Sequence, residues 1–251
     1  MRAVASMQSS DTAREQYAWR ERDVLSTINK DGQPLRARSD ETDAVSQVDG
    51  IEYDRVIARD GRMLSTKDAA KEARKAARFI RRHSTAKAKA KDEREQAKQR
   101  KQRRELLAAI PQAFTVAFAP DPDPELCNCD VVTLTPRPLY RPPNKDLELL
   151  RHVAATVWIE RGDFAVVRAR FRFLQAVHIG WVLAKIEPGS EFQLQNAPVD
   201  GHWFEHSFTG TLVARVLLVK KYHLHVDDSY SDYRKFGVTS RVLAPTPLIR
   251  H

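Results

Sequence analysis

Runs of alternating apolar and polar residues fill the second half of the chain, between residues 152 and 236. The clearest is HVAATVWIERGDFAVVRARFRF, in which two runs flank the turn residues Arg161, Gly162 and Asp163. One face is apolar in both runs and consists of Val153, Ala155, Val157 and Ile159, then Val167, Ala169, Phe171 and Phe173. The other face of the second run carries Arg168, Arg170 and Arg172. This period of two predicts an antiparallel hairpin with one apolar and one polar side.

The same alternation predicts further strands. Before the middle of the chain they span 17–29, 35–48 and 51–59, and later they span 114–119, 130–135, 181–186, 191–196, 202–213 and 215–233. Residues 145–152 fit a short helix, and the polar first residues are expected to be frayed.

A helical segment interrupts the strands. Ser65 with Asp68 three residues later is typical of a capping box and predicts a helix start. One side of this helix is expected to pack on the sheet and carries Ala69, Ala73, Ala76, Ala77 and Ile80. An unbroken helix over 65–109 would be about 68 Å long, so we expect a break near residues 83–85. An apolar anchor, Leu106, Leu107 and Ile110, precedes Pro111.

These elements predict an α+β fold that is mainly antiparallel β. About ten strands would form a strongly curved, incomplete β-barrel, with helices covering its concave face. The 251 residues are enough for a sizeable core, and we expect one domain, 1–251, with a long basic helical insertion at 65–110.

Positive charge is concentrated in that insertion. Residues 67–105 hold sixteen Lys and Arg against six Asp and Glu, a balance of +10 in a chain whose net charge is +9. The rest of the chain is therefore almost neutral. No apolar stretch approaches the length of a membrane helix, and the first residues lack the apolar region of a secretory signal.

Motifs for catalysis are missing. The chain has 9 glycines and contains no GxGxxG or GxxxxGK[ST] loop, no HExxH and no GxSxG. The carboxylates of ETDAVSQVDGIEYD and DPDPE occur in turn-like composition, which favours solvated loops. We therefore expect neither enzymatic activity nor a cofactor.

Histidine and cysteine give weak signals for a metal. His223 and His225 would point the same way on one strand, with His202 and His206 on the strand before, but solvent-facing histidines explain this spacing better. Cys127 and Cys129 fit neither a zinc finger nor a disulfide framework, so a free or loosely paired thiol is expected. No metal site is predicted.

Apolar residues on the predicted concave face are the first candidate site. A cavity for acyl chains could be lined by Val157, Ile159, Phe171, Phe173, Trp181, Leu183, Phe192, Leu194, Phe204, Phe208 and Leu212. A dry core packed by the helices would use the same residue types, so periodicity leaves both alternatives open.

Basic residues of the insertion are the second candidate. An anionic membrane or nucleic acid could be contacted by Lys87, Lys89, Lys91, Arg94, Lys98, Arg100, Lys101, Arg103 and Arg104. No aromatic residue follows Phe79 in this segment to stack on bases, which makes nucleic acid the weaker interpretation. A solvated charged helix is the alternative without a partner.

The order of TLTPRPLYRP, VAATVWIERGDFAVVRARFRF, AKIEPGSEFQLQ and YHLHVDDSYSDYRKF resembles the outer-membrane lipoprotein-sorting proteins, the LolA/LolB-like lipoprotein carrier superfamily, over residues 113–236. This resemblance implies an incomplete barrel around helices, a hydrophobic cavity for acyl chains, a periplasmic location and no catalysis. The basic insertion is not part of the usual carrier.

The sequence thus favours a monomeric, non-enzymatic periplasmic carrier of lipid or lipoprotein acyl chains, with the basic helix approaching an anionic membrane. The competing hypothesis is a cytoplasmic protein that holds nucleic acid or an acidic partner through residues 86–105.

Overall fold

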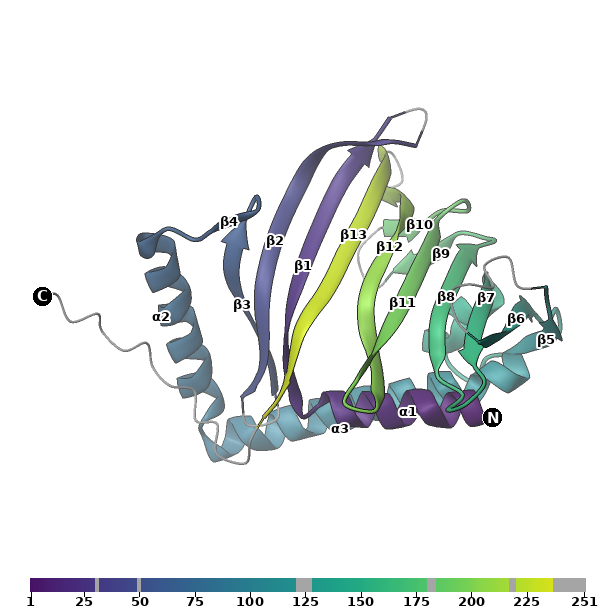
Figure 1. The fold of residues 1–251 in the computed structure, drawn as a ribbon, viewed down its shortest axis with the longest axis horizontal. Coiled ribbons are helices and arrows are strands. Elements are labelled where there is room, and N and C mark those ends of the chain that lie inside the picture. Colours follow the sequence, from purple (N-terminus) through teal and green to yellow (C-terminus); the bar gives the residue numbers. More distant parts are fainter. Residues whose placement is uncertain (30–31, 49–50, 121–127, 180–183, 217–219, 237–251) are drawn as a thin grey trace, which may run out of the picture.

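The structure, a computed structural model, describes residues 1–29, 32–48, 51–120, 128–179, 184–216 and 220–236. Its centre is one 13-stranded antiparallel sheet in which eleven strands follow the order β4-β3-β2-β1-β13-β12-β11-β8-β7-β6-β5 (Figure 1). The short strands β9 and β10 pair with each other, and β10 also pairs with β12. Within the described residues the edge strands β4 and β5 do not pair, so the sheet is open. The predicted α+β class, with a curved sheet that does not close into a barrel, is confirmed.

The strands agree closely with the prediction. In the first half they are β1 (Tyr17–Ile28), β2 (Pro34–Val48), β3 (Ile51–Arg59), β4 (Arg62–Met63), β5 (Phe114–Phe118) and β6 (Cys129–Pro136). In the second half they are β7 (Val153–Glu160), β8 (Val166–Phe173), β9 (Val177–Ile179), β10 (Ala184–Ile186), β11 (Glu191–Val199), β12 (His202–Val216) and β13 (Lys220–Lys235). The short strands β4 and β9 were not predicted.

Helices accompany one face of the sheet, which we call the helix-side face. They are α1 (Arg2–Arg14), α2 (Thr66–His83), α3 (Ala86–Ala113) and the 3-10 helix η1 (Lys145–Arg151). Figure 1 shows α1 and α3 running across one end of the strands, with α2 beside β3. We call this end of the sheet the helix end.

The prediction of a frayed start is wrong, because residues 2–14 form α1. Its side chains are held by partners distant in sequence: Met7 packs on the apolar face of the sheet, and Arg14 pairs with Glu205. Tertiary contacts of this kind decide whether a short helix with weak local signals persists.

The predicted boundaries of the helical segment are partly confirmed. Ser65 accepts a hydrogen bond from the Asp68 backbone N–H, and α2 ends at His83 as expected. The helix α3, however, continues through Pro111 to Ala113. Burial of Ala109, Ala113 and Phe114 against η1 stabilises this last turn and outweighs the hydrogen bond that proline removes.

The side of α2 that faces the sheet differs from the predicted alanine stripe. Ala69, Ala77 and Ile80 are exposed, whereas Glu72 is buried and the Phe79 ring lies 4.5 Å from the Tyr53 ring of β3. Alanine buries little area, so the aromatic contact sets the rotation of the helix.

A β-bulge changes one face of the β7–β8 hairpin. The register shifts between Trp158 and Ile159, so Ile159 pairs with Val166. Val166 therefore joins Val157 on the helix-side face, and Val167 lies on the opposite face, where it packs with Trp158. The assignment of Val167 to the apolar face was wrong, and the opposite face is not uniformly polar.

The cysteine prediction also needs correction. Cys129 is buried at the start of β6 and takes part in a disulfide bond. The expected free thiol is therefore wrong for this residue, and Cys127 lies outside the described residues.

Candidate functional site

The predicted apolar residues fall into two groups on the helix-side face. Near the helix end, Val157 and Ile159 belong to a cluster covered by Met7 of α1. Farther along the strands, the second cluster contains Phe171, Phe173, Phe192, Phe208 and Leu212. Trp181 and Leu183 lie outside the described residues.

The second cluster is an aromatic surface built from three neighbouring strands. Phe192 lies 6.0 Å from Phe173 in an edge arrangement and 5.2 Å from Phe208 in a stacked one. Phe173 and Phe192 are buried, whereas Phe171, Phe208 and Leu212 are half-buried. We call Phe171, Phe208 and Leu212, together with the half-buried Leu194 beside Phe208, the apolar patch.

Phe204 lies instead in an aromatic group under the end of α1. Its ring is 4.9 Å from Tyr17 and 5.1 Å from Tyr233. With Leu194 it lines a cavity of about 40 Å³ between α1 and the sheet. This volume admits a water molecule or two and no acyl chain.

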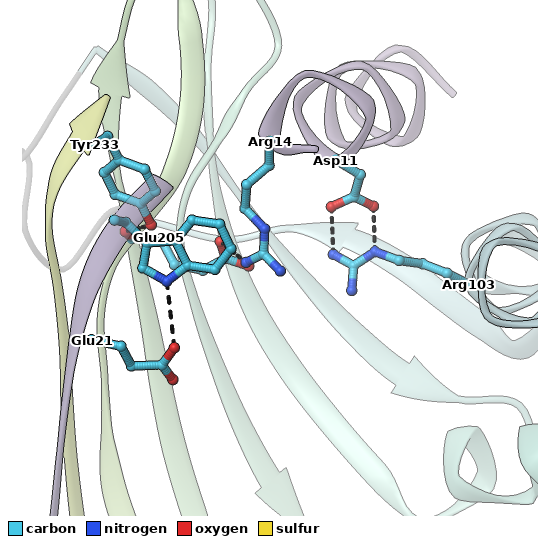
Figure 2. Close-up of polar contacts among 7 residues, drawn as sticks. Asp11, Arg14, Glu21, Arg103, Glu205 and Tyr233 are labelled. Atoms are coloured by element: carbon cyan, nitrogen blue, oxygen red, sulfur yellow. Dashed lines mark hydrogen bonds and ion pairs between the residues drawn. The ribbon is translucent and has the colours of Figure 1, made fainter. Parts of the chain in front are cut away.

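Polar contacts join α1 to the sheet and to α3 (Figure 2). Arg14 donates a hydrogen bond of 2.7 Å to Glu205, whose backbone oxygen accepts another from Tyr233. Asp11 accepts two hydrogen bonds from Arg103 of α3. These contacts fix α1 between the sheet and α3.

One cavity in the described part of the chain is lined mainly by charged and amide side chains. It encloses about 710 Å³ between α1, α3 and the β2–β3 end of the sheet. Arg14, Glu52, Gln99 and Arg104 line it, together with further charged and amide side chains; only Ile51 and Leu107 are apolar. None of the described residues predicted to line an acyl-chain cavity lines this space. Its charged and amide side chains suit polar groups.

Carboxylates line the helix-side face on β1, β2, β3 and β13. They alternate along the strands, and the register aligns them across strands: Glu21 and Asp23 on β1, Glu41 and Asp43 on β2, Glu52 and Asp54 on β3, and Asp228 on β13. We call these seven residues the acidic face. The prediction that ETDAVSQVDGIEYD forms solvated loops was wrong for Glu41 and Asp43, which lie on β2, and for Glu52 and Asp54, which lie on β3. Asp49 lies outside the described residues. The DPDPE carboxylates lie outside the described residues.

Burial and mutual repulsion raise the pKa values of several carboxyl groups on the acidic face. Burial, with repulsion from Asp23 next, raises the pKa of Glu21 to about 7. Burial, with repulsion from Asp23 and Glu21, raises the pKa of Asp228 to about 7. Burial also raises the pKa of Asp43 to about 6, with repulsion from Glu41 and Asp54. Like charges on directly neighbouring positions of adjacent strands destabilise a sheet.

This repulsion predicts a pH dependence of folding. The pKa values of Glu21 and Asp228 are higher in the folded than in the unfolded protein, so their contribution to stability is full below about pH 4 and is lost as pH rises through about 7. The double substitution Glu21→Gln with Asp228→Asn should raise the free energy of unfolding at pH 8 by about 2 kcal/mol, discounted for partial exposure and shared repulsion. Urea unfolding at pH 5 and pH 8 measures this.

The matched control replaces the exposed Glu93 and Glu191 by glutamine, with the same change of charge. We expect this control to change the free energy of unfolding by no more than about 0.5 kcal/mol at either pH. A gain that is equal at pH 5 and pH 8 would contradict the assignment to titrating carboxylates.

The nine predicted basic residues do not form one surface. Arg100 and Arg103 pair with Glu15 and Asp11 of α1, and Arg104 lines the polar cavity. Exposed on the opposite side of α3 are Lys87, Lys91, Arg94, Lys98 and Lys101. The ninth residue, Lys89, is exposed as well.

The histidines are not brought together. His223 and His225 pair with Val213 and Thr211, toward the end of β12. His202 begins β12, and His206 lies four residues farther along the same strand. Within the described residues, no group of three or more His, Cys, Asp or Glu side chains could hold a metal ion.

Sequence reasoning missed the acidic face, although a signal was present. In each of β1, β2 and β3, two carboxylates stand two residues apart within a strand, as in Glu21 and Asp23. A period of two places such pairs on one side of a strand. The alignment of the strands, which joins the pairs into one surface, depends on register.

No protein-family model matches the chain, and no curated protein matches it. Among solved structures it is similar to an outer membrane lipoprotein-sorting protein domain from Vibrio parahaemolyticus, with 10% identity, 95% of this chain and 94% of that chain covered, and a TM-score of 0.39. It is also similar to the Pseudomonas aeruginosa MucA/MucB complex structure, with 10% identity, coverage of 95% and 100%, and a TM-score of 0.29.

In the part of the chain that the structure describes, no helix has both the length and the apolar composition needed to cross a membrane.

Proposed function

We propose that the protein is a non-enzymatic, periplasmic carrier or binding protein that shelters acyl chains of a lipid or lipoprotein on the helix-side face. The observation that carries this proposal is the apolar patch, where Phe171, Phe208 and Leu212 remain half-buried beside the buried Phe173–Phe192 pair. Each methylene that leaves water there contributes about 0.8 kcal/mol.

The position of the patch is consistent with a ligand that enters from the open part of the sheet. Met7 of α1 packs on the cluster near the helix end. The aromatic cluster farther along is contacted by Leu149 of η1 and by Ile186 of β10. An acyl chain would lie along β8, β11 and β12 next to these side chains.

The acidic face limits what the polar part of the ligand can be. Asp228 is the direct cross-strand neighbour of Phe208, so carboxylates begin where the apolar patch ends. An anionic group placed there would be repelled, and a neutral or cationic group would be attracted. We therefore expect the polar end of the ligand near β13 to carry no negative charge.

Native mass spectrometry and binding of a lipidated peptide test the proposal. We expect the purified protein to retain acyl ligand, and Phe208→Ser with Leu212→Ser to weaken binding of the lipidated peptide at least tenfold, because about 1.5 kcal/mol or more is lost for each apolar side chain. Circular dichroism verifies that the variant is folded.

The matched control, Leu35→Ser with Leu139→Ser, changes two leucines that are 54% and 90% exposed. It should bind as the wild type does. If the wild type neither carries lipid nor binds the lipidated peptide, the carrier proposal is wrong.

A further inference from the structure

Basic residues occur at the same spacing on the outer sides of α2 and α3. They are Lys67, Lys71, Arg74, Arg78 and Arg81 on α2, and Lys87, Lys91, Arg94, Lys98 and Lys101 on α3. Steps of four and three residues keep each row on one side of its helix. All ten side chains are exposed, and we call the two rows the basic stripes.

Both stripes point away from the rest of the protein. The contacting side of α2 includes Glu72 and Phe79, and that of α3 includes Asp92 and Leu107. At 3.6 residues per turn, these contacting sides lie about 140° around the helix from the stripes. The rotation that seats each helix therefore turns its basic row outward.

The charges of the stripes are almost entirely unneutralised. Lys101 lies 3.8 Å from Glu105, and the other nine residues form no ion pair with a described acidic residue. By contrast, Arg100 and Arg103 on the other side of α3 are paired with α1. The stripes are thus separate from the contacts that hold α3 in place.

We propose that the basic stripes bind the anionic surface of a lipid bilayer. On α2 the exposed Ala77 lies next to the stripe, whereas the exposed Ala69 and Ile80 lie on a different side of the helix. A row of basic side chains without acidic partners is attracted to the negative surface potential of anionic lipids. The proposal does not depend on acyl binding by the helix-side face.

Two features disfavour nucleic acid as the partner. Neither stripe contains an aromatic residue on which bases could stack. The axes of α2 and α3 also diverge at the break between them, so one straight duplex could follow only one stripe (Figure 1). Anionic lipids diffuse laterally and can meet either stripe without a fixed spacing.

Sedimentation with vesicles tests the proposal on the full chain. Vesicles of phosphatidylglycerol and phosphatidylethanolamine should bind the protein at low salt, and vesicles of phosphatidylcholine alone should not. Each basic residue near an anionic surface contributes about a fivefold factor in affinity. Lys67→Gln with Lys71→Gln and Arg74→Gln should therefore weaken binding on the order of a hundredfold.

A control with the same change of charge separates the stripes from net charge. Arg141→Gln, Lys145→Gln and Arg172→Gln remove three exposed charges elsewhere on the molecule. We expect this variant to lose less than about threefold in affinity, since its residues lie outside the stripes. An equal loss in both variants would overturn the proposal.

Two further results would also overturn it. One is no sedimentation with anionic vesicles at low salt. The other is that an RNA or DNA oligonucleotide binds more tightly than anionic vesicles at equal salt, and that the α2 variant loses this oligonucleotide binding. The α2 variant should still bind lipidated peptide, so failure of this proposal is distinguishable from failure of the carrier proposal.

Discussion

Replacing Trp158 by alanine is expected to lower the free energy of unfolding by about 4 kcal/mol, because the substitution removes the largest fully buried side chain and leaves a cavity. Trp158 is 0% exposed and packs with Cys129, Val131 and Val167 on the face opposite the helices. Urea unfolding followed by far-UV circular dichroism measures this loss.

The guanidinium groups of Arg168 and Arg170 lie 5.5 Å from the centre of the Trp158 ring. Trp158→Phe keeps most of the apolar volume and an aromatic face for these groups, so it should cost clearly less than the alanine substitution. Phe118→Ala is the control for an exposed aromatic, since Phe118 is 81% exposed and should change stability by less than about 0.5 kcal/mol. A loss below about 1 kcal/mol for Trp158→Ala would contradict a packed core on this face.

Replacing Gly210 by alanine is expected to cost about 3 kcal/mol or more, because the added methyl group has no space. A Cβ at this position would lie 2.2 Å from the backbone oxygen of Glu191 and 2.7 Å from the Cα of Phe192. Both atoms belong to the backbone of β11, which cannot move without disturbing its pairing with β12. Thermal unfolding would show the loss.

The effect of Gly210 also bears on the proposed site, since Phe192 and Gly210 are cross-strand partners beneath the apolar patch. The control is Thr211→Ala at the next position of the same strand, which removes atoms and should cost less than about 1 kcal/mol. Equal stability of the Gly210→Ala variant and the wild type would show that β11 and β12 are farther apart than described.

The helix-side face combines two chemistries that meet on β13. Apolar side chains occupy β8, β11 and β12 and include Val226 of β13, whereas carboxylates occupy β1, β2, β3 and, at Asp228, β13. The raised pKa values of Glu21, Asp43 and Asp228 report the cost of gathering these carboxylates. A ligand or partner with apolar and cationic parts would relieve that cost, which is consistent with the limit placed on the ligand's polar end.

The strands were predictable because their signal is local. Alternation in 153–160 and 166–173 gave both strands of the hairpin, and Ser65 with Asp68 gave the start of α2. The bulge opposite Trp158 and Ile159 was not predictable, because the residues of β7 and β8 alternate as in a regular hairpin. The register shift arises only when the two strands pair. It moved Val167 to the opposite face.

The candidate sites were predictable only in part. Phe171, Phe208 and Leu212 were named from alternation and share one apolar surface, whereas Phe204 packs under α1. The five outward basic residues of α3 were named, but their separation from Arg100, Arg103 and Arg104 depends on how α3 is rotated.

The sequence alone therefore determined the long strands, the start of α2, the break between α2 and α3, and which residues are apolar or charged, since periodicity and capping act over a few residues. The tertiary structure decided that residues 2–14 are helical, that separate carboxylate pairs form one acidic face, and that charged and amide side chains line the cavity between α1 and α3. These outcomes depend on strand register and helix rotation, which are fixed by contacts between residues far apart in the chain.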